Sequence, residues 1–371
     1  MAHPEPPSFD DDAVVELLRQ QLESLCRQGW LPVDLVEIVR RRASGDAVSF
    51  VVDAVADWSA RHPAATMHPR WSEQLRTVGA TVWWDARHPY PGQWAARWRD
   101  GDRRVMLTAA LDVLGVLRRL PPLQRIVPAP GEQTSTAGTG AAVDDTMLTR
   151  VRALLAKAES TTFPDEAEAL SAKAQELMSR YSIEQSVAAG ARPAGALASA
   201  RRIWLDAPYV GPKTLLVGEV GSANHCRTVS SERLGFTTVL GDDVALDVVE
   251  VLATSLLVQA TSAMVAAGTH GGADGRSRTR SFRHSFLLSY ATRIGERLRD
   301  TAGRAEAEAG TDLVAIHAER HRAVDELYET LFPTVAQRSF TAGSSAGWGA
   351  GRSAADQAEL TGGRRELDVG S

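Results

Sequence analysis

The sequence predicts a mainly α-helical protein with a small α+β domain at its C-terminal end, in which long helices pack against a short antiparallel sheet. Three observations support this fold class. Apolar residues recur at helical spacing through the N-terminal third of the chain, and a charged stretch near its middle has the pattern of a helical hairpin. Two short segments, CRTVSS and GFTTVLG, precede two long helical runs, an order that is typical of α+β domains.

The N-terminal region, residues 1–126, is predicted to consist of helices. The run DDAVVELLRQQLESLC has apolar residues three and four apart, and Gly29 and Pro32 end it. PVDLVEIVRRR begins a second helix with proline in its first turn, and DAVSFVVDAVADWSARH and DRRVMLTAALDVLGVLRRL form two more. Residues 127–145 are rich in Pro, Gly, Ser and Thr, have no periodicity, and are predicted to form a flexible linker.

Residues 146–186 are predicted to form a helical hairpin, in which STTFP joins two amphipathic helices. Thr161 or Thr162 can cap the second helix, and Pro164 suits its first turn. The charged residues fall largely on the outer faces, where they are more typical of solvated surface than of a catalytic acid–base pair. The apolar stripe of the second helix comprises Phe163, Ala167, Leu170, Ala174, Leu177 and Tyr181.

A second linker, residues 187–200, is predicted to lead into an α+β domain at 201–371. GPKTLLVGEVGSANHC is expected to be helical, CRTVSS and GFTTVLG to be strands around SERL, and GDD to cap the long helix VALDVVEVLATSLLVQATSAMVAAG. THGGADGRSRTR is predicted to be a flexible loop before the helix SFRHSFLLSYATRIGERLRD. In the tail, SSAGWGAGRSAADQAEL has small residues that would let a helix approach its neighbour closely.

The predicted hairpin resembles a known family. Its segments LLAKAES, PDEAEAL and AKAQELMSRYSI are similar to the bacterial and phage family called domain of unknown function 2786. GDDVALDVVEVL and SFRHSFLLSYATRIGERL resemble the companion domain that often follows this hairpin, and the Arg-rich and Ala-rich N-terminal region is similar to that of actinobacterial members. The resemblance implies this three-part architecture, and it implies no activity or catalytic residue.

Length, charge and cysteine content restrict the classes of protein. A chain of 371 residues, 44% hydrophobic and 23% charged, has room for two or three domains of ordinary soluble composition, and its net charge of −5 argues against a surface covered with nucleic acid. Cys26 and Cys226 are too few for a disulfide scaffold. The N-terminus lacks signal-peptide features, and no apolar run approaches the roughly 20 residues that span a bilayer. We therefore expect a cytoplasmic protein without a membrane partner.

An Arg-rich segment is the strongest candidate binding site. RSRTRSFRHSFLLSYATRIGERLR contains a single acid, Glu296, and charge of one sign in an acidic protein is expected where phosphate binds. The alternative is an arginine-decorated surface without a partner, because only three of the 41 basic residues of the chain are Lys. The residues expected to contact nucleic acid or another polyanion are Arg276, Arg278, Arg280, Arg283, Arg293 and Arg297.

Three further patterns suggest chemistry and are less specific. His317, His321 and Asp325 share one helix face, but the aspartate lies two turns from the first histidine and the helix supplies no third ligand, so we expect no metal ion. Cys226 follows a histidine, but neighbours in a strand point to opposite faces, and a small buried residue is expected. VGPKTLLVG is not a phosphate loop, because Asp206 stands where its first glycine belongs. No cofactor is expected.

The N-terminal region contains seven of the nine tryptophans of the chain. TVWWDARHPYPGQWAARWRD interleaves aromatic residues with Arg87, Arg97 and Arg99, a pattern that could stack bases and hold phosphates of single-stranded nucleic acid. Trp94 and Trp98, one helical turn apart, fit a packed core better. We therefore favour packing over binding for these residues.

The hairpin is expected to dock a partner through its lysines. Lys157 and Lys173 lie on it in a chain that otherwise uses Arg, and a compact ammonium group suits a site that the rigid fork of Arg does not fit. A protein partner, or one that presents phosphate, is the expected ligand of this surface.

Two classes of function stay open at this level. The leading hypothesis is a non-catalytic binding protein associated with nucleic acid. The competing hypothesis is an enzyme, hydrolase-like and of unknown reaction, with its site in the C-terminal domain. Its candidate residues are Asp242, Asp243, His284 and His317.

Overall fold

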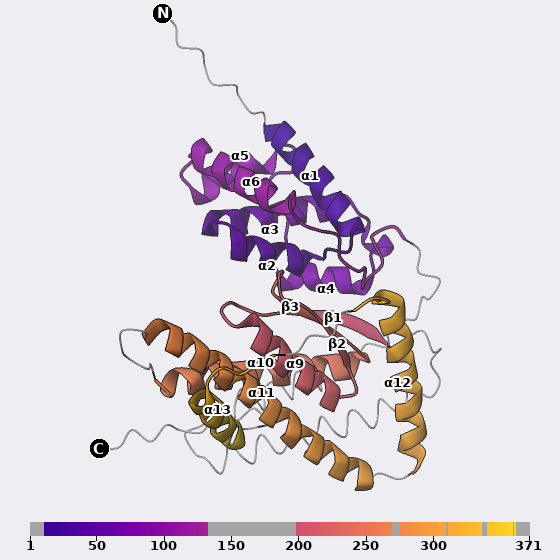
Figure 1. Ribbon diagram of the computed structural model, residues 1–371. Helices are drawn as coiled ribbons and strands as arrows, with labels where there is room; N and C mark the ends of the chain where they lie inside the picture. The colour runs from indigo at the N-terminus through magenta and orange to yellow at the C-terminus, as the bar shows by residue number, and fades with distance from the viewer. Residues whose placement is uncertain are drawn as a thin grey trace, which may run out of the picture. The chain divides into compact units, whose positions relative to one another are not determined.

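The computed structural model describes residues 11–132, 198–268, 275–308, 311–335, 340–358 and 360, without the side chains of residues 65, 275–278 and 301–317. The chain divides into two compact units, Met1–Ala137 and Gly138–Ser371. It is mainly helical with a small three-stranded antiparallel sheet, which confirms the predicted fold class (Figure 1). The predicted hairpin at 146–186 lies outside the described residues.

The described part of unit 1 is helical. The helices expected from the sequence are α1 (Asp11–Arg27), α2 (Pro32–Arg42), α3 (Gly45–Ser59) and α6 (Arg103–Leu117). Between α3 and α6 the structure adds shorter elements, η1 (Ala64–Thr66), α4 (Pro69–Thr77) and α5 (Tyr90–Trp98). Short polar side chains cap two of the helices. The Ser44 hydroxyl accepts a hydrogen bond from the Ala47 amide at the start of α3, and Asp102 accepts one from Arg104 at the start of α6.

Tryptophans fill the core of unit 1, as the sequence analysis favoured; the expected core packing is correct for Trp94 and wrong for Trp98. Five of them, Trp30, Trp58, Trp71, Trp84 and Trp94, are buried, whereas Trp98 is 47% exposed. Two buried indoles donate hydrogen bonds to the segment that follows α6, from Trp30 to the Pro121 carbonyl at 2.8 Å and from Trp71 to the Pro128 carbonyl at 2.9 Å. Val127 and Ala129 are therefore buried within unit 1, although the sequence placed residues 127–132 in a flexible linker.

The sheet of unit 2 has the strand order β1-β3-β2, with both pairs antiparallel. Its strands are β1 (Ser199–Trp204), β2 (Arg227–Ser231) and β3 (Phe236–Gly241). The two strands predicted from the sequence, β2 and β3, are present. The central strand β3 is buried along its whole length. The sequence analysis missed β1, whose first two residues fall in the predicted linker 187–200.

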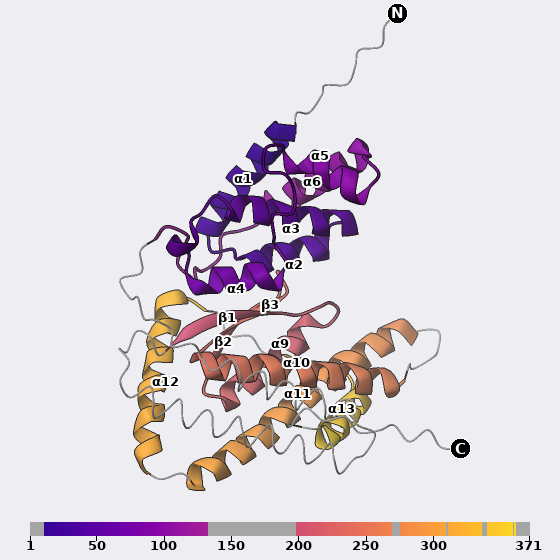
Figure 2. The ribbon, with the colours of Figure 1, turned by 180° about the vertical axis from the view of Figure 1, so that it is seen from behind.

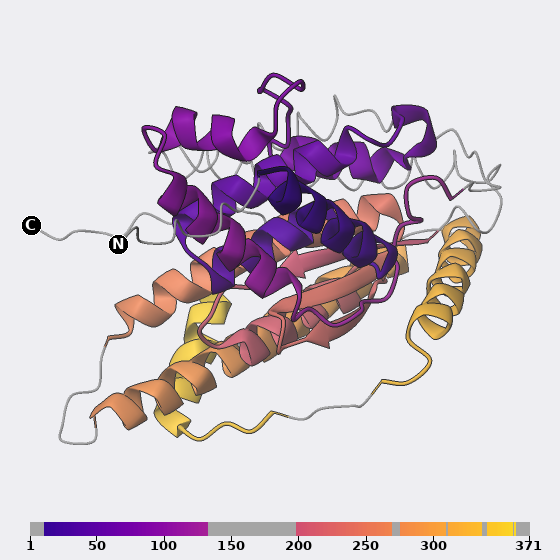
Figure 3. The same cartoon turned by 90° about the horizontal axis from the view of Figure 1, so that it is seen from above.

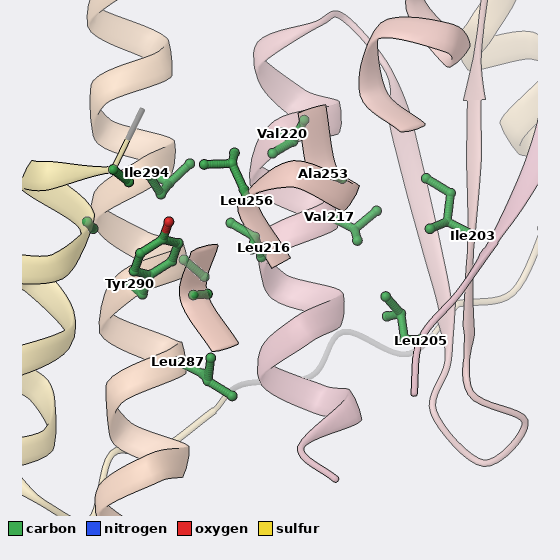
Figure 4. Packing of buried hydrophobic residues seen from close by; sticks show 14 of the residues in the cluster. Ile203, Leu205, Leu216, Val217, Val220, Ala253, Leu256, Leu287, Tyr290 and Ile294 are labelled. Carbon is green, nitrogen blue, oxygen red and sulfur yellow. The ribbon is translucent and has the colours of Figure 1, made fainter. Parts of the chain in front are cut away.

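In the described part of unit 2, five helices accompany the sheet. They are α9 (Val210–Ala223), α10 (Asp243–Ala266), α11 (Gly275–Glu308), α12 (Thr311–Leu331) and α13 (Ser345–Gln357). Helices α9 and α10 lie against one face of the sheet (Figures 1 and 2). Leu216, Val217 and Val220 of α9 lie between sheet residues such as Ile203 and the Tyr290 face of α11 (Figure 4). The core of unit 2 therefore runs from the sheet through α9 to α11.

Small residues allow α13 to lie directly on α11, which confirms the prediction for the tail. A methyl group added at Gly347 would collide with the backbone of Phe282, and one at Gly351 would collide with the carbonyl oxygen of Phe286. The buried Ser285 hydroxyl, also on α11, accepts hydrogen bonds of 3.0 Å from the Gly343 and Ser344 amides just before α13. Backbone contact of this kind requires glycine.

Two expectations for the long helices are corrected. Helix α11 begins at Gly275, so the arginines of GRSRTR lie in its first turns and not in a flexible loop. Helix α10 is long and apolar enough to cross a membrane by length and composition, contrary to the expectation that no run approaches that length. Because the core helix of a soluble protein passes the same test, and one face of α10 is buried in the core of unit 2, this is weak evidence for a membrane span.

We expect Gly351→Ala to lower the free energy of unfolding of the protein by about 1–3 kcal/mol, because the added methyl group forces α13 away from the rigid backbone of α11. Gly349 provides a matched control, since an alanine there would contact nothing within 4 Å. Gly349→Ala should raise the free energy of unfolding by up to about 1 kcal/mol through helix propensity. Urea denaturation of the two variants checks this, and equal effects of the same sign would contradict the proposed close packing.

Candidate functional site

The arginines at the start of α11 form the candidate site. We call residues 275–284 the basic segment; it contains Arg276, Arg278, Arg280 and Arg283, and α11 has no acidic residue in its first turn. Arg280 is exposed. Arg283 is half-buried, and its buried Nε has no hydrogen-bond partner among the described residues. The side chains of Arg276 and Arg278 lie outside the described ones.

The basic segment lies at one end of unit 2. The end of α10 and the start of α11 both extend beyond the sheet at that end (Figure 3). Helical periodicity places residues 276, 280 and 283 on the same side of α11, since they are four and three residues apart. The four arginines thus lie in the first turns of α11, where the helix N-terminus itself carries a partial positive charge.

The later arginines of the predicted site have partners within unit 2. Arg293 forms ion pairs with Asp356 at 2.5 Å and with Glu296 at 2.8 Å. Arg297 donates hydrogen bonds to the carbonyls of Ala355 and Ala358 at the C-terminal end of α13, at 2.5 and 2.6 Å. These contacts hold α13 on α11, so Arg293 and Arg297 have a different role from that proposed for the basic segment.

Glu296 neutralises much of the charge in this second group. Its carboxylate accepts hydrogen bonds from Arg352 and from Arg293, and these lower the pKa of Glu296 to about 2. Arg299, one turn further along α11, pairs with Glu219 of α9 at 2.6 Å. Arg280 and Arg283 of the basic segment, in contrast, form no ion pair of this kind among the described residues.

The residues proposed for an enzyme have structural partners. Asp242 caps α10 by accepting a hydrogen bond from the Ala245 amide, and it pairs with Arg320 at 3.3 Å. Asp243 accepts a hydrogen bond of 2.7 Å from the Ser199 hydroxyl. His284 lies half-buried on α11, and the side chain of His317 lies outside the described ones.

Cys226 is a buried core residue, as expected. Burial, and to a smaller extent the charge of Asp242, raises the pKa of its thiol to about 12. Since the thiolate is the reactive form, this cysteine is not an activated nucleophile. Among the described side chains, no group of three or more His, Cys, Asp or Glu residues is placed to hold a metal ion.

The predicted hairpin is the part of the chain with a recognised relationship. Residues 146–185 match a family described as a protein of unknown function (DUF2786). No curated protein and no solved structure matches the chain. Lys157 and Lys173 lie within the DUF2786 match and outside the described residues, so their role in docking stays a prediction.

A buried carboxylate in unit 1 was not anticipated. Asp53 of α3 is 6% exposed, and both of its oxygens accept a hydrogen bond from the Trp83 indole at 3.0 Å. The guanidinium of Arg97 lies 4.4 Å above the same indole and 4.8 Å above that of Trp98. Burial raises the pKa of Asp53 to about 6, although the Trp83 hydrogen bond and the charge of Arg97 oppose the shift. The sequence feature that could have indicated this buried carboxylate is the position of Asp53 within the apolar run SFVVDAVADW.

We expect the unfolding free energy of the protein to rise as the pH falls from about 7 to about 5. Because the pKa of Asp53 is raised above its unfolded value of 3.8, the folded state takes up a proton in this range that the unfolded state does not. Asp53→Asn should remove this part of the pH dependence in chemical denaturation. Asp57, one turn later and paired with Arg19 at 2.6 Å, is the control. Asp57→Asn should destabilise the protein at both pH values, and an unchanged pH dependence in Asp53→Asn would contradict the assignment.

Proposed function

We propose that the protein binds nucleic acid through the basic segment of α11. The observation that carries this proposal is the charge at the start of the helix: the basic segment, residues 275–284, includes four arginines and no acidic residue, and Arg280 is exposed. Neutralising phosphates with arginines releases counterions from nucleic acid, which is the main source of affinity in sequence-independent binding.

The position of the arginines within the helix supports an anionic ligand. The N-terminal end of a helix carries a partial positive charge and favours acidic side chains, whereas the first turns of α11 carry arginines and no acid. This arrangement disfavours the isolated helix by repulsion. A phosphate backbone placed against it would interact favourably with the arginines and with the helix dipole together.

The tryptophans of unit 1 do not support base stacking as the mode of binding. Five of them are buried, and the Arg97 guanidinium packs on the indoles of Trp83 and Trp98. The proposed binding therefore rests on phosphate contacts, which position a nucleic acid without reading its sequence. We expect low sequence specificity and a strong dependence on salt.

The competing hypothesis, an enzyme in the C-terminal domain, has less support. Asp242 serves as the cap of α10, and Asp243 is hydrogen-bonded to Ser199 of β1. Both carboxylates thus have roles in the fold that need no substrate.

We expect replacement of Arg276, Arg278, Arg280 and Arg283 by Gln to weaken binding to a labelled single strand and a labelled duplex. Glutamine keeps helix propensity while removing the charge. In fluorescence anisotropy between about 50 and 200 mM salt, the slope of log K against log salt should become less negative. The expected change is about 0.7 per lost contact for the single strand and about 0.9 for the duplex.

Two double variants separate the effect of where the charge lies from the effect of net charge. Arg280→Gln with Arg283→Gln removes two charges from the basic segment, and Arg233→Gln with Arg322→Gln removes two exposed charges elsewhere in unit 2. The first pair should reduce the salt slope, and the second should leave it nearly unchanged. Equal effects of the two pairs, or no binding by the unaltered protein at low salt, would overturn the proposal.

A further inference from the structure

We infer that the protein forms a dimer with a second copy of itself through an apolar face of unit 1. This face, which we call the leucine face, consists of Leu17, Leu107, Leu111 and Leu114. It is separate from the basic segment, so the inference does not depend on nucleic-acid binding.

The leucine face belongs to two helices that run side by side in the same direction. Arg103 at the start of α6 forms an ion pair of 2.6 Å with Asp11 at the start of α1. Further along, the Gln21 side chain donates a hydrogen bond of 3.4 Å to the carbonyl of Leu117, the last residue of α6. Leu17 lies one turn before Gln21, so it is on the side of α1 that borders α6 and between these two contacts.

The leucines are accessible from solvent. Leu17 is 50% exposed and Leu111 is 60% exposed, whereas Leu107 and Leu114 are half-buried. Residues 107, 111 and 114 are four and three apart, so they share one side of α6, and they lie between the same two contacts as Leu17. The four side chains thus form a contiguous apolar patch, and such patches commonly serve as protein interaction sites.

A glycine on α6 permits a close approach of another helix to this face. Gly115 lies one turn after Leu111 in the interior of α6, where glycine is disfavoured. A methyl group added at Gly115 would contact nothing within 4 Å. The packing of unit 1 therefore does not require this glycine, whereas a partner helix that packs on α6 would benefit from it.

The size of the face suits a weak dimer. Helices α1 and α6 are 17 and 15 residues long. Two adjacent helices of this length present a face of about 25 by 20 Å, or about 500 Å². When the face packs on itself it buries about 1,000 Å² in total, near the lower limit for a specific interface. We therefore expect a reversible dimer with a dissociation constant in the micromolar range.

Charge determines how the two copies align. Arg104 and Arg118 are exposed and lie seven residues before and after Leu111, on the same side of α6. An antiparallel α6 pair centred on Leu111 would bring Arg104 against the partner's Arg118, where like charges repel. If α1 instead packs on the partner's α6 in the same direction, the exposed Glu16 lies near the end that carries the partner's Arg104. A two-fold axis parallel to the helices produces this favourable pairing twice.

Sedimentation equilibrium of the full-length protein, free of nucleic acid, tests the inference. We expect a monomer–dimer equilibrium across micromolar concentrations. Leu17→Gln with Leu111→Gln should raise the dissociation constant by more than about tenfold, because two apolar anchors at the centre of the interface are lost. Val258→Gln with Val265→Gln on α10 is the matched control, since these valines are 62% and 59% exposed. The control pair should leave the dissociation constant unchanged.

Charge reversal tests the alignment. At low salt, Glu16→Arg and Arg104→Glu should each raise the dissociation constant by about two- to tenfold, and the double variant should restore it because opposite charges meet again. Circular dichroism should show that every variant is folded. A monomer at all concentrations of the unaltered protein would overturn the inference, as would equal effects of the leucine and valine pairs. A tighter dimer in Arg104→Glu alone would indicate the antiparallel pair and overturn the proposed interface.

Discussion

The enclosure of α9 between the sheet and α11 is the contact on which the rest of unit 2 depends. Three strands bury little apolar surface by themselves, and the sheet obtains a core from the side chains that α9 presents to it. The opposite side of α9 packs on α11, so the helix must be apolar nearly all round. Its buried Thr214 avoids the cost of an unsatisfied hydroxyl by donating a hydrogen bond of 2.6 Å to the Gly211 carbonyl. Displacement of α9 would therefore separate the sheet from α11.

The arginines of unit 2 divide into two groups by their surroundings. Arg201 on β1 contacts Asp247 and Glu250 of α10, and Arg227 contacts Asp325 of α12, so these side chains join elements that are distant in sequence. The Arg227–Asp325 pair is exposed and stabilises the fold only slightly, whereas Arg201 and Asp247 are partly buried. The basic segment of α11 lies outside these pairings as described. That contrast distinguishes the arginines that join elements of the fold from those that we propose as ligand contacts.

Local sequence patterns predicted the elements whose causes are local. The Asp242 cap of α10 and the small residues of α13 could be read from neighbouring residues, and the structure has both. Strand β1 could not, because SARRIW follows a run rich in Ala and Gly and becomes a strand only by pairing with β3. The start of α11 was missed because Gly and Ser near Gly275 are typical of loops.

The candidate sites show the same limit. The basic segment could be predicted from composition. The ion pair of Arg293 could not, because its partner Asp356 lies 63 residues away in sequence. The approach of His225 to His321 likewise results from the packing of α12 on the sheet. Spacing along one helix cannot reveal a contact that another element supplies.

Each unit contains a single cysteine, and both cysteines are buried and free: Cys26 on α1 and Cys226 before β2. Burial raises the pKa of both thiols, so neither is an effective nucleophile while its surroundings are intact. A bulky thiol reagent can reach each sulfur only when the helices or strands around it open. The labelling rates of the two sulfurs thus compare the local opening of one unit with that of the other in the same intact chain.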